Sequence, residues 1–203
     1  MNAPARMTSW LLLGLLTVVV GGAAALGVVQ SPNNAPLQQA VKNTLAAPNY
    51  TEMLDTTTPN GSQTLHLVFQ APDRLGGYAI NGNRRTYIFI IGRYEFQSLA
   101  VPAGGSDKHL TFYRQAGRAA SQADPARGFL HFAERGQNVK GSAGSYTFTV
   151  TQNGVTGAFT ATVSGSYVSA MTLVAPNESD QLKISQVGTS PHVALPSGSR
   201  VVG

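Results

Sequence analysis

The chain has 203 residues, no cysteine and a formal net charge of +5, and only 11% of its residues are charged. The absence of cysteine excludes disulfide bonds, thiolate metal sites and a lipid-modified cysteine. Because the basic residues are scattered along the sequence, the charge predicts mild attraction to an anionic membrane surface or cell wall and argues against a nucleic-acid interface, which needs basic residues on one face.

Residues 1–30 form an apolar segment that predicts export, with Arg6 supplying its positive start. Two interpretations stay open. It is either a cleaved signal peptide with Ala23-Ala24-Ala25 as the small-residue cleavage site, or a retained helix from Trp10 to Val29 that is long enough to span a bilayer. In both cases the chain after the short linker at residues 31–36 is expected to lie outside the cytoplasm.

A short amphipathic helix is predicted after this linker. Pro36 can open it and Pro48 ends it. Between them, one mainly apolar stripe recurs at helical spacing. It consists of Leu37, Ala40, Val41, Thr44 and Leu45.

The following fifty residues are predicted to form strands joined by tight turns. Asn60-Gly61 and Asn81-Gly82 mark hairpins, because both residue types tolerate positive φ. The run at 86–91 is almost continuously apolar, so both faces of this strand carry apolar side chains. It is therefore expected to be buried on both faces. The expected strands are 50–58, 65–71, 74–80, 86–91 and 94–99.

A helical period then interrupts the strands, after a Gly-rich loop at 102–107 and a short strand at 110–113. Asp124 is expected to cap a second helix, with Pro125 at its first position and Gly136 after its end. Its apolar stripe consists of Ala126, Phe129, Leu130 and Ala133.

The last third of the chain alternates again between apolar and polar residues. Asn153-Gly154 predicts another hairpin. The domain is expected to span 37–190, and residues 191–203, rich in Gly, Ser and Pro, are expected to form a flexible tail. The expected strands are 146–151, 155–163, 167–174 and 182–187.

This order of elements predicts one curled sheet. Glycine and proline are frequent, at 22 and 11 residues, and most strand connections are short, so neighbouring strands should be antiparallel. Nine or ten strands in one sheet should twist and curl, and two short helices can fill only the concave face. The predicted fold class is α+β, mainly β: a curled antiparallel sheet with two helices on its concave face, plus the N-terminal apolar helix.

Several phrases stand in a fixed order between residues 36 and 200: Phe69 to Arg74, Asp124 to Arg127, Val139 to Gly141 leading to Tyr146 to Val150, Gly165 to Val168, and Ile184-Ser185 to Leu195-Pro196. In these phrases the chain resembles the actinobacterial lipoproteins of the LppX/LprG type and, more distantly, the lipoprotein carrier LolA. The resemblance implies a half-barrel with a hydrophobic cavity between sheet and helices, and a role in carrying or sensing acylated lipids. The chain departs from many of those relatives because it lacks the lipobox cysteine.

Motifs for catalysis are absent. The sequence contains no nucleophile elbow, phosphate-binding loop or dinucleotide fingerprint, and its histidines are isolated from one another. A catalytic carboxylate pair is possible in principle, but solvated strand faces and turns are the simpler interpretation of Glu52, Asp55, Asp73 and Glu95. The sequence therefore predicts no enzyme, no metal site and no cofactor.

The large apolar side chains have two interpretations, because an ordinary core and a lipid-accepting cavity use the same residue types. The cavity candidates are Leu65, Leu67, Phe69, Tyr87, Phe89, Ile91, Phe129, Phe132, Tyr146, Phe148 and Phe159. The leading hypothesis is a non-enzymatic binding protein for a lipid, glycolipid or other acyl-chain ligand in the cell envelope, anchored at the outer face of the cytoplasmic membrane or secreted. The alternative is a structural or signalling envelope module with a filled core that binds another protein.

Overall fold

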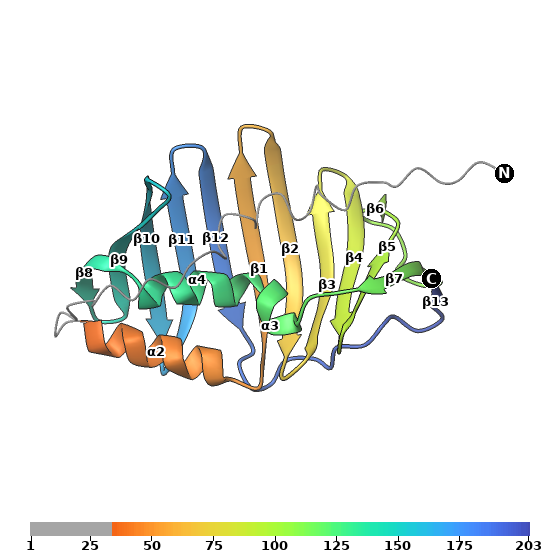
Figure 1. The fold of residues 1–203 in the computed structure, drawn as a ribbon, viewed down its shortest axis with the longest axis horizontal. Coiled ribbons are helices and arrows are strands. Elements are labelled where there is room, and N and C mark those ends of the chain that lie inside the picture. Colours follow the sequence, from red (N-terminus) through yellow and green to blue (C-terminus); the bar gives the residue numbers. More distant parts are fainter. Residues whose placement is uncertain (1–33) are drawn as a thin grey trace.

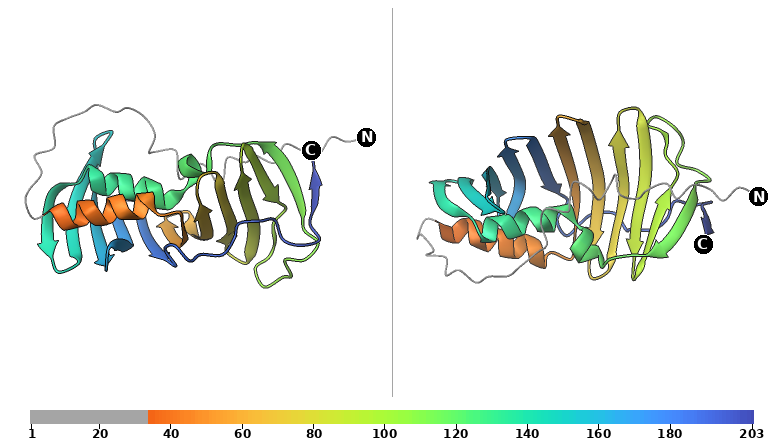
Figure 2. Two further views of the ribbon diagram at one scale, coloured as in Figure 1. Left: turned by 90° about the horizontal axis from the view of Figure 1, so that it is seen from below. Right: turned by 45° about the horizontal axis from the view of Figure 1, so that its top comes forward.

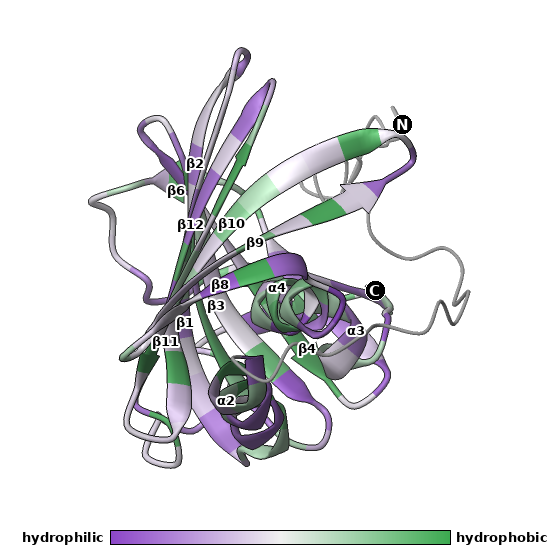
Figure 3. Cartoon of the chain, turned by 90° about the vertical axis from the view of Figure 1, so that its left-hand side faces the viewer, coloured by the Kyte–Doolittle hydropathy of each residue, from purple (hydrophilic) through white to green (hydrophobic). Residues whose placement is uncertain are grey.

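A long sheet, curled over three helices, makes up the part of the chain that the computed structural model describes, residues 34–203 (Figures 1 and 3). The signal peptide or membrane anchor predicted for residues 1–30 lies outside this range. Within residues 34–203, none of the helices is long and apolar enough to cross a membrane.

Thirteen strands share this one sheet. The helices are α2 (Ala35–Ala46), α3 (Ala120–Ala123) and α4 (Pro125–Glu134). The strands are β1 (Asn49–Thr58), β2 (Gly61–Gln70), β3 (Arg74–Asn81), β4 (Arg84–Ile91), β5 (Tyr94–Ser98), β6 (Val101–Pro102), β7 (Thr111–Ala116), β8 (Gln137–Ser142), β9 (Ser145–Gln152), β10 (Val155–Ser164), β11 (Tyr167–Ala175), β12 (Glu178–Ser185) and β13 (Arg200–Val202).

Across the sheet the strand order is β13-β7-β5-β4-β3-β2-β1-β12-β11-β10-β9-β8, with β6 paired to β4. Strands β1 and β12, distant in sequence, therefore join the two halves of the sheet at its centre, from Thr51 opposite Ser185 to Thr57 opposite Ser179. The short pair β13–β7 is parallel, whereas the other pairs described are antiparallel. The predicted fold class, a curled and mainly antiparallel sheet, is confirmed.

Tight turns set the register at or next to the predicted positions. The first two hairpin loops are residues 59–60 and 82–83, each shifted by one residue from the predicted Asn60-Gly61 and Asn81-Gly82, whereas the third lies where it was predicted. Gln152 pairs with Val155, so Asn153-Gly154 is a two-residue loop, and both loop residues have positive φ, 52° and 79°. This is the backbone that favours Asn-Gly, because its twist matches that of the flanking strands. The sequence did not predict α3, β6, β8 or β13, since these elements are short or rich in polar residues and glycine.

One face of the sheet carries the main core. Along most of β9, β10 and β12, buried side chains alternate with more exposed ones, so in this half only the concave face is covered. Helices α2 and α4 lie across it (Figures 2 and 3). We call this cluster the concave core; its buried members include Leu37, Val41, Tyr50, Leu67, Phe69, Phe129, Leu130, Tyr146, Phe148, Phe159, Met171 and Leu182.

A second cluster lies on the opposite face, behind β2–β4. Leu75 pairs with Ile90 on the concave side, so the neighbouring pair of Gly76 and Phe89 must face the other way. We call this cluster the convex core: Tyr87, Phe89, Leu110, Phe112 and Val193. Because β4 contributes to both clusters, the prediction that it is buried on both faces is confirmed.

The C-terminal segment closes the convex core, and the prediction that residues 191–203 form a flexible tail is wrong. Val193 is buried and its carbonyl oxygen accepts a hydrogen bond from Arg74 Nη1 (3.0 Å). The segment then crosses from β12 to the far edge of the sheet, where β13 pairs with β7 (Figure 1). It has few apolar residues, but Val193 and Leu195 are enough to cover a face that would otherwise expose aromatic rings.

We predict that Val193→Ala lowers the free energy of unfolding by about 2 kcal/mol, because two buried methyl groups are lost. Urea unfolding followed by circular dichroism measures this. The matched control is Val155→Ala, the same change at a side chain that is 55% exposed. Equal effects of the two changes would show that the C-terminal segment does not stabilise the sheet.

Candidate functional site

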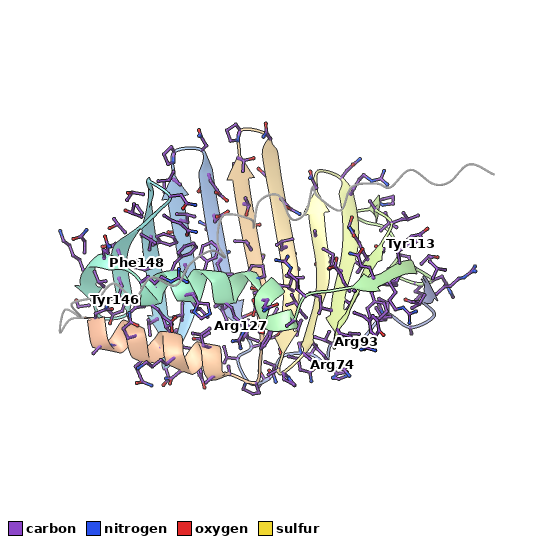
Figure 4. All side chains as sticks on the ribbon, viewed as in Figure 1. Arg74, Arg93, Tyr113, Arg127, Tyr146 and Phe148 are labelled. Atoms are coloured by element: carbon purple, nitrogen blue, oxygen red, sulfur yellow. The ribbon has the colours of Figure 1, made fainter. Side chains whose placement is uncertain are left out.

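Aromatic rings line the contact between α4 and the strands beneath it. Phe148 on β9 and Phe159 on β10 stack with their centres 5.1 Å apart and 4° between their planes. From α4, Phe132 approaches the Phe159 ring to 5.2 Å and Phe129 approaches it to 6.4 Å, both between ring centres. Figure 4 shows Tyr146 and Phe148 at the left-hand end of the sheet, beside the end of α4. The apolar face of α4 is thus in direct contact with the sheet.

The structure brings together eight of the eleven cavity candidates. These eight lie in the concave core or pack against it: Leu65, Leu67, Phe69, Phe129, Phe132, Tyr146, Phe148 and Phe159. Tyr87 and Phe89 belong to the convex core instead. Ile91 lies on the same face of β4 as Tyr87 and Phe89, because it is two residues from Phe89 along the strand. The sequence could not separate the two groups, because β4 is apolar on both faces.

Asp124 fixes the start of α4 in the interior. As predicted, it caps the helix: its Oδ1 accepts hydrogen bonds from the backbone N–H groups of Ala126 (2.9 Å) and Arg127 (3.4 Å). The hydroxyl of Tyr50, on β1, donates a hydrogen bond to its Oδ2. Both partners are buried, and burial together with the nearby carboxylates raises the pKa of Tyr50, so it stays a neutral donor.

Glu52 lies beside Asp124, and the prediction that it faces solvent is wrong. It is only 1% exposed, and its Oε2 accepts a hydrogen bond from the same Ala126 N–H (2.8 Å). Its other oxygen, Oε1, has no hydrogen-bond partner among residues 34–203. Burial and the charge of Asp124 raise the pKa of Glu52 well above its usual value. Asp124 accepts from Tyr50, Ala126 and Arg127, whereas Glu52 accepts from Ala126 alone, so of the two carboxyls Glu52 holds a proton more readily.

Arg127 joins this pair of carboxyls to the rest of the concave core. Its Nε lies 3.5 Å from Asp124 Oδ2, and its guanidinium carbon lies 4.5 Å from the centre of the Phe69 ring. Its Nη2 donates to the carbonyl oxygen of Leu45 in α2 (2.9 Å). Phe69 in turn stacks on Tyr50 at 5.1 Å. We call Tyr50, Glu52, Asp124 and Arg127 the polar latch, because they hold the first turn of α4 against β1, β2 and α2.

Helix α2 supports α4 from below with further polar contacts. Gln38 Nε2 donates to the carbonyl oxygen of Ala133 near the end of α4 (3.0 Å). Thr44 Oγ1 donates to Ala40 and accepts from the backbone N–H of Val168 on β11 (3.0 Å). The two helices therefore form one layer: they are bonded to each other near the end of α4, and to the sheet through Thr44 of α2 and through the start of α4.

A second carboxyl pair lies on β12. Asp180 is 5% exposed, and its Oδ1 has no partner within the described chain. It faces the concave side, where it pairs with Thr56 and Leu173. Burial raises the pKa of both Asp180 and Glu178. Across residues 34–203, no three or more His, Asp or Glu side chains gather into a group that could hold a metal ion.

These features define a class of protein, a half-barrel whose concave aromatic face is covered by a thin helical layer. Among solved structures, the lipoprotein LppX of Mycobacterium tuberculosis has this fold: the match has a TM-score of 0.51 at 13% sequence identity and covers 79% of this chain and 97% of LppX. At this identity the match shows the fold alone. The predicted resemblance to LppX-type proteins is therefore confirmed as a likeness of fold.

LprF of Mycobacterium bovis also matches, with a TM-score of 0.49, 14% identity, and 83% of this chain and 98% of LprF covered. No family model matches the sequence, and no curated protein matches it.

We predict that Asp124→Ala lowers the free energy of unfolding by about 1–2 kcal/mol, because it removes the cap of α4. Asp124→Asn is the matched control, since its amide oxygen can still accept from the first turn of the helix. Urea unfolding of both variants measures the difference. Equal losses would mean that the charge of Asp124, and not its capping bonds, stabilises the helix.

A second prediction concerns pH. Because the pKa of Glu52 is raised in the folded state, its contribution to stability is complete below the usual value of 4.5 and is lost as the pH rises through the raised pKa. Glu52→Gln should therefore reduce the decline in unfolding free energy between mildly acidic and alkaline pH. Urea titrations at several pH values measure this, and an unchanged pH profile would contradict it.

Proposed function

We propose that this chain is a non-enzymatic, extracytoplasmic binding protein for an acyl-chain ligand, held between the curled sheet and the layer of α2 and α4. One observation carries the proposal: a continuous aromatic and aliphatic face on β9–β12, β1 and β2 is covered by short helices and not by a second sheet. An apolar face of this kind can accept acyl chains, and each CH₂ that leaves water contributes about 0.8 kcal/mol. The LppX-like fold and the predicted export segment are consistent with a location in the cell envelope.

Ligand entry in this proposal requires α4 to move. Phe132 and Phe159 are in contact, and Leu130 has no exposed surface, so the described structure corresponds to the closed state. The polar latch is the part of this contact that gives way most easily, because it contains a carboxyl oxygen without a partner and two carboxyls with raised pKa. Opening there lets α4 swing away from β9 and β10.

The same close packing favours the second candidate, an envelope module with a permanently filled core that acts by binding another protein. In that case Phe129, Phe132, Phe148 and Phe159 are structural residues, and α4 stays in place. The two candidates differ in whether α4 is displaced by an acyl-chain ligand, and this can be measured.

We predict that the purified chain takes up dioleoyl phosphatidylglycerol in a one-to-one complex seen by native mass spectrometry, and that amide hydrogen exchange in α4 changes on uptake. Asp124→Ala should speed uptake, because it weakens the latch. Val193→Ala is the matched control, since it destabilises the convex core without touching α4.

Faster uptake by Asp124→Ala alone supports the binding-protein proposal. If neither the parent chain nor Asp124→Ala takes up lipid, the filled-core module is the correct candidate. Equal acceleration by both variants would indicate that lipid binds to unfolded chains, which would also contradict the proposal.

A further inference from the structure

Charge is divided unevenly between the two halves of the sheet. Residues 73–118 and 189–203, which form β3–β7, β13 and the segment covering the convex core, carry eight Lys or Arg and three Asp or Glu residues. The remaining described residues, 34–72 and 119–188, carry five basic and six acidic ones. Basic residues that are scattered in sequence are therefore gathered by the fold toward the β13 end of the sheet.

Four exposed arginines concentrate at this end: Arg93, Arg114, Arg118 and Arg200. Arg93 precedes β5, Arg114 lies on β7, Arg118 follows β7 and Arg200 begins β13. We call these four residues the basic edge. Figure 4 places Arg93 at the lower corner of this end and Tyr113, on β7, above it.

Two members of the basic edge share one aromatic ring. The guanidinium carbons of Arg93 and Arg114 each lie 5.2 Å from the centre of the Tyr94 ring. Within residues 34–203 neither arginine pairs with an Asp or Glu side chain, since the ion pairs there are Arg127–Asp124 and His131–Glu134. Arg114 Nη2 also donates a hydrogen bond to the carbonyl oxygen of Gly203 (2.8 Å). Two cations held beside one ring repel each other, and an anion that binds at this end of the sheet reduces this repulsion.

Large apolar side chains are exposed at the same end. Tyr113 is 50% exposed and Val201 is 42% exposed, on the neighbouring strands β7 and β13. Leu99, just after β5, is 59% exposed. Tyrosine and aliphatic side chains beside arginine are the combination that favours the boundary between lipid headgroups and acyl chains. A nucleic-acid surface would gain nothing from the exposed valine and leucine.

We propose that the basic edge, together with Tyr113 and Val201, docks this end of the half-barrel on an anionic phospholipid membrane. The arginines bind headgroup phosphates, and Tyr113 and Val201 enter the interface between headgroups and acyl chains. Docking by this end points the long axis of the sheet away from the membrane surface, with the β8–β9 end farthest from the lipids. The proposal concerns the β13 end of the sheet, where Val201 lies on the convex face with Phe112 and Tyr113 lies on the opposite face. It does not depend on what binds beneath α4.

The test is partition of the full chain onto vesicles of phosphatidylcholine, with and without about 30% phosphatidylglycerol. The test variant changes Arg93, Arg114, Arg118 and Arg200 to Gln. The matched control changes four exposed basic residues of the other half to Gln, Lys42, Arg135, Lys140 and Lys183, and so removes the same charge. Residues 1–30 are present in every chain, so their contribution is the same throughout.

We expect the parent chain to prefer the anionic vesicles, the test variant to lose about tenfold or more of this binding, and the control variant to lose less than about twofold. High salt should weaken the binding of the parent chain to anionic vesicles to the level of the test variant. This measurement requires no substitution. Tyr113→Ser with Val201→Ser should also weaken binding while keeping every charge.

Equal losses in the test and control variants would overturn the proposal, because the effect would then reflect net charge alone. So would equal binding of the parent chain to neutral and anionic vesicles. Binding to duplex DNA or to an anionic polymer without binding to vesicles would overturn it as well. If the fourfold test variant does not fold, Arg93→Gln with Arg118→Gln serves in its place. A loss of lipid uptake with vesicle docking intact, or the reverse, separates this proposal from the proposed function.

Discussion

The attachment of α4 to the sheet is the interaction on which the concave face depends. A curled sheet buries its inner face only if something fills the curl, and here the filling is one ten-residue helix with α2 beside it. The helix brings its apolar stripe onto Phe148 and Phe159, while its first turn is held by carboxyls that reach it from β1 and from its own cap. Without that turn in place, the aromatic rings of β9 and β10 would face water.

Buried carboxyls are an expensive means of attaching a helix, since taking a charge out of water costs several kcal/mol unless it is well paired. The start of a helix lowers this cost, because unpaired N–H groups and the positive end of the helix dipole favour negative charge. Asp124 and Glu52 use this by accepting from the same Ala126 N–H. An apolar contact would be more stable, whereas the polar latch is directional and can respond to protonation.

The sheet uses its two faces differently along its length. Near β8–β12 only the concave face is covered, and the outer face alternates to polar residues. Near β2–β4 both faces are covered, the outer one by the C-terminal segment around Val193. This second core stiffens the half that carries the basic edge. A half covered on both faces and a half covered on its concave face alone are thus joined through the β1–β12 pair at the centre of the sheet.

The sequence alone predicted the local structure: the strands, a tight turn and a capped helix. Alternation predicted the strands, Asn153-Gly154 predicted a turn that requires positive φ, and Asp124-Pro125 predicted a capped helix, because each depends only on neighbouring residues. The sequence also predicted that the rings of β9 and β10 share one face, since apolar and polar residues alternate in these strands.

Only the tertiary structure decided which apolar faces meet. The register of β3 and β4 determines that Phe89 packs with Val193 and not with Phe159. The sequence of β4 could not predict this, because the strand is apolar on both faces. From the sequence, Glu52 was predicted to be a solvated strand residue. It is buried because β1 lies against the start of α4. The gathering of Arg93, Arg114, Arg118 and Arg200 at one end likewise depends on long-range pairing, because β13 joins β7 across a separation of nearly ninety residues.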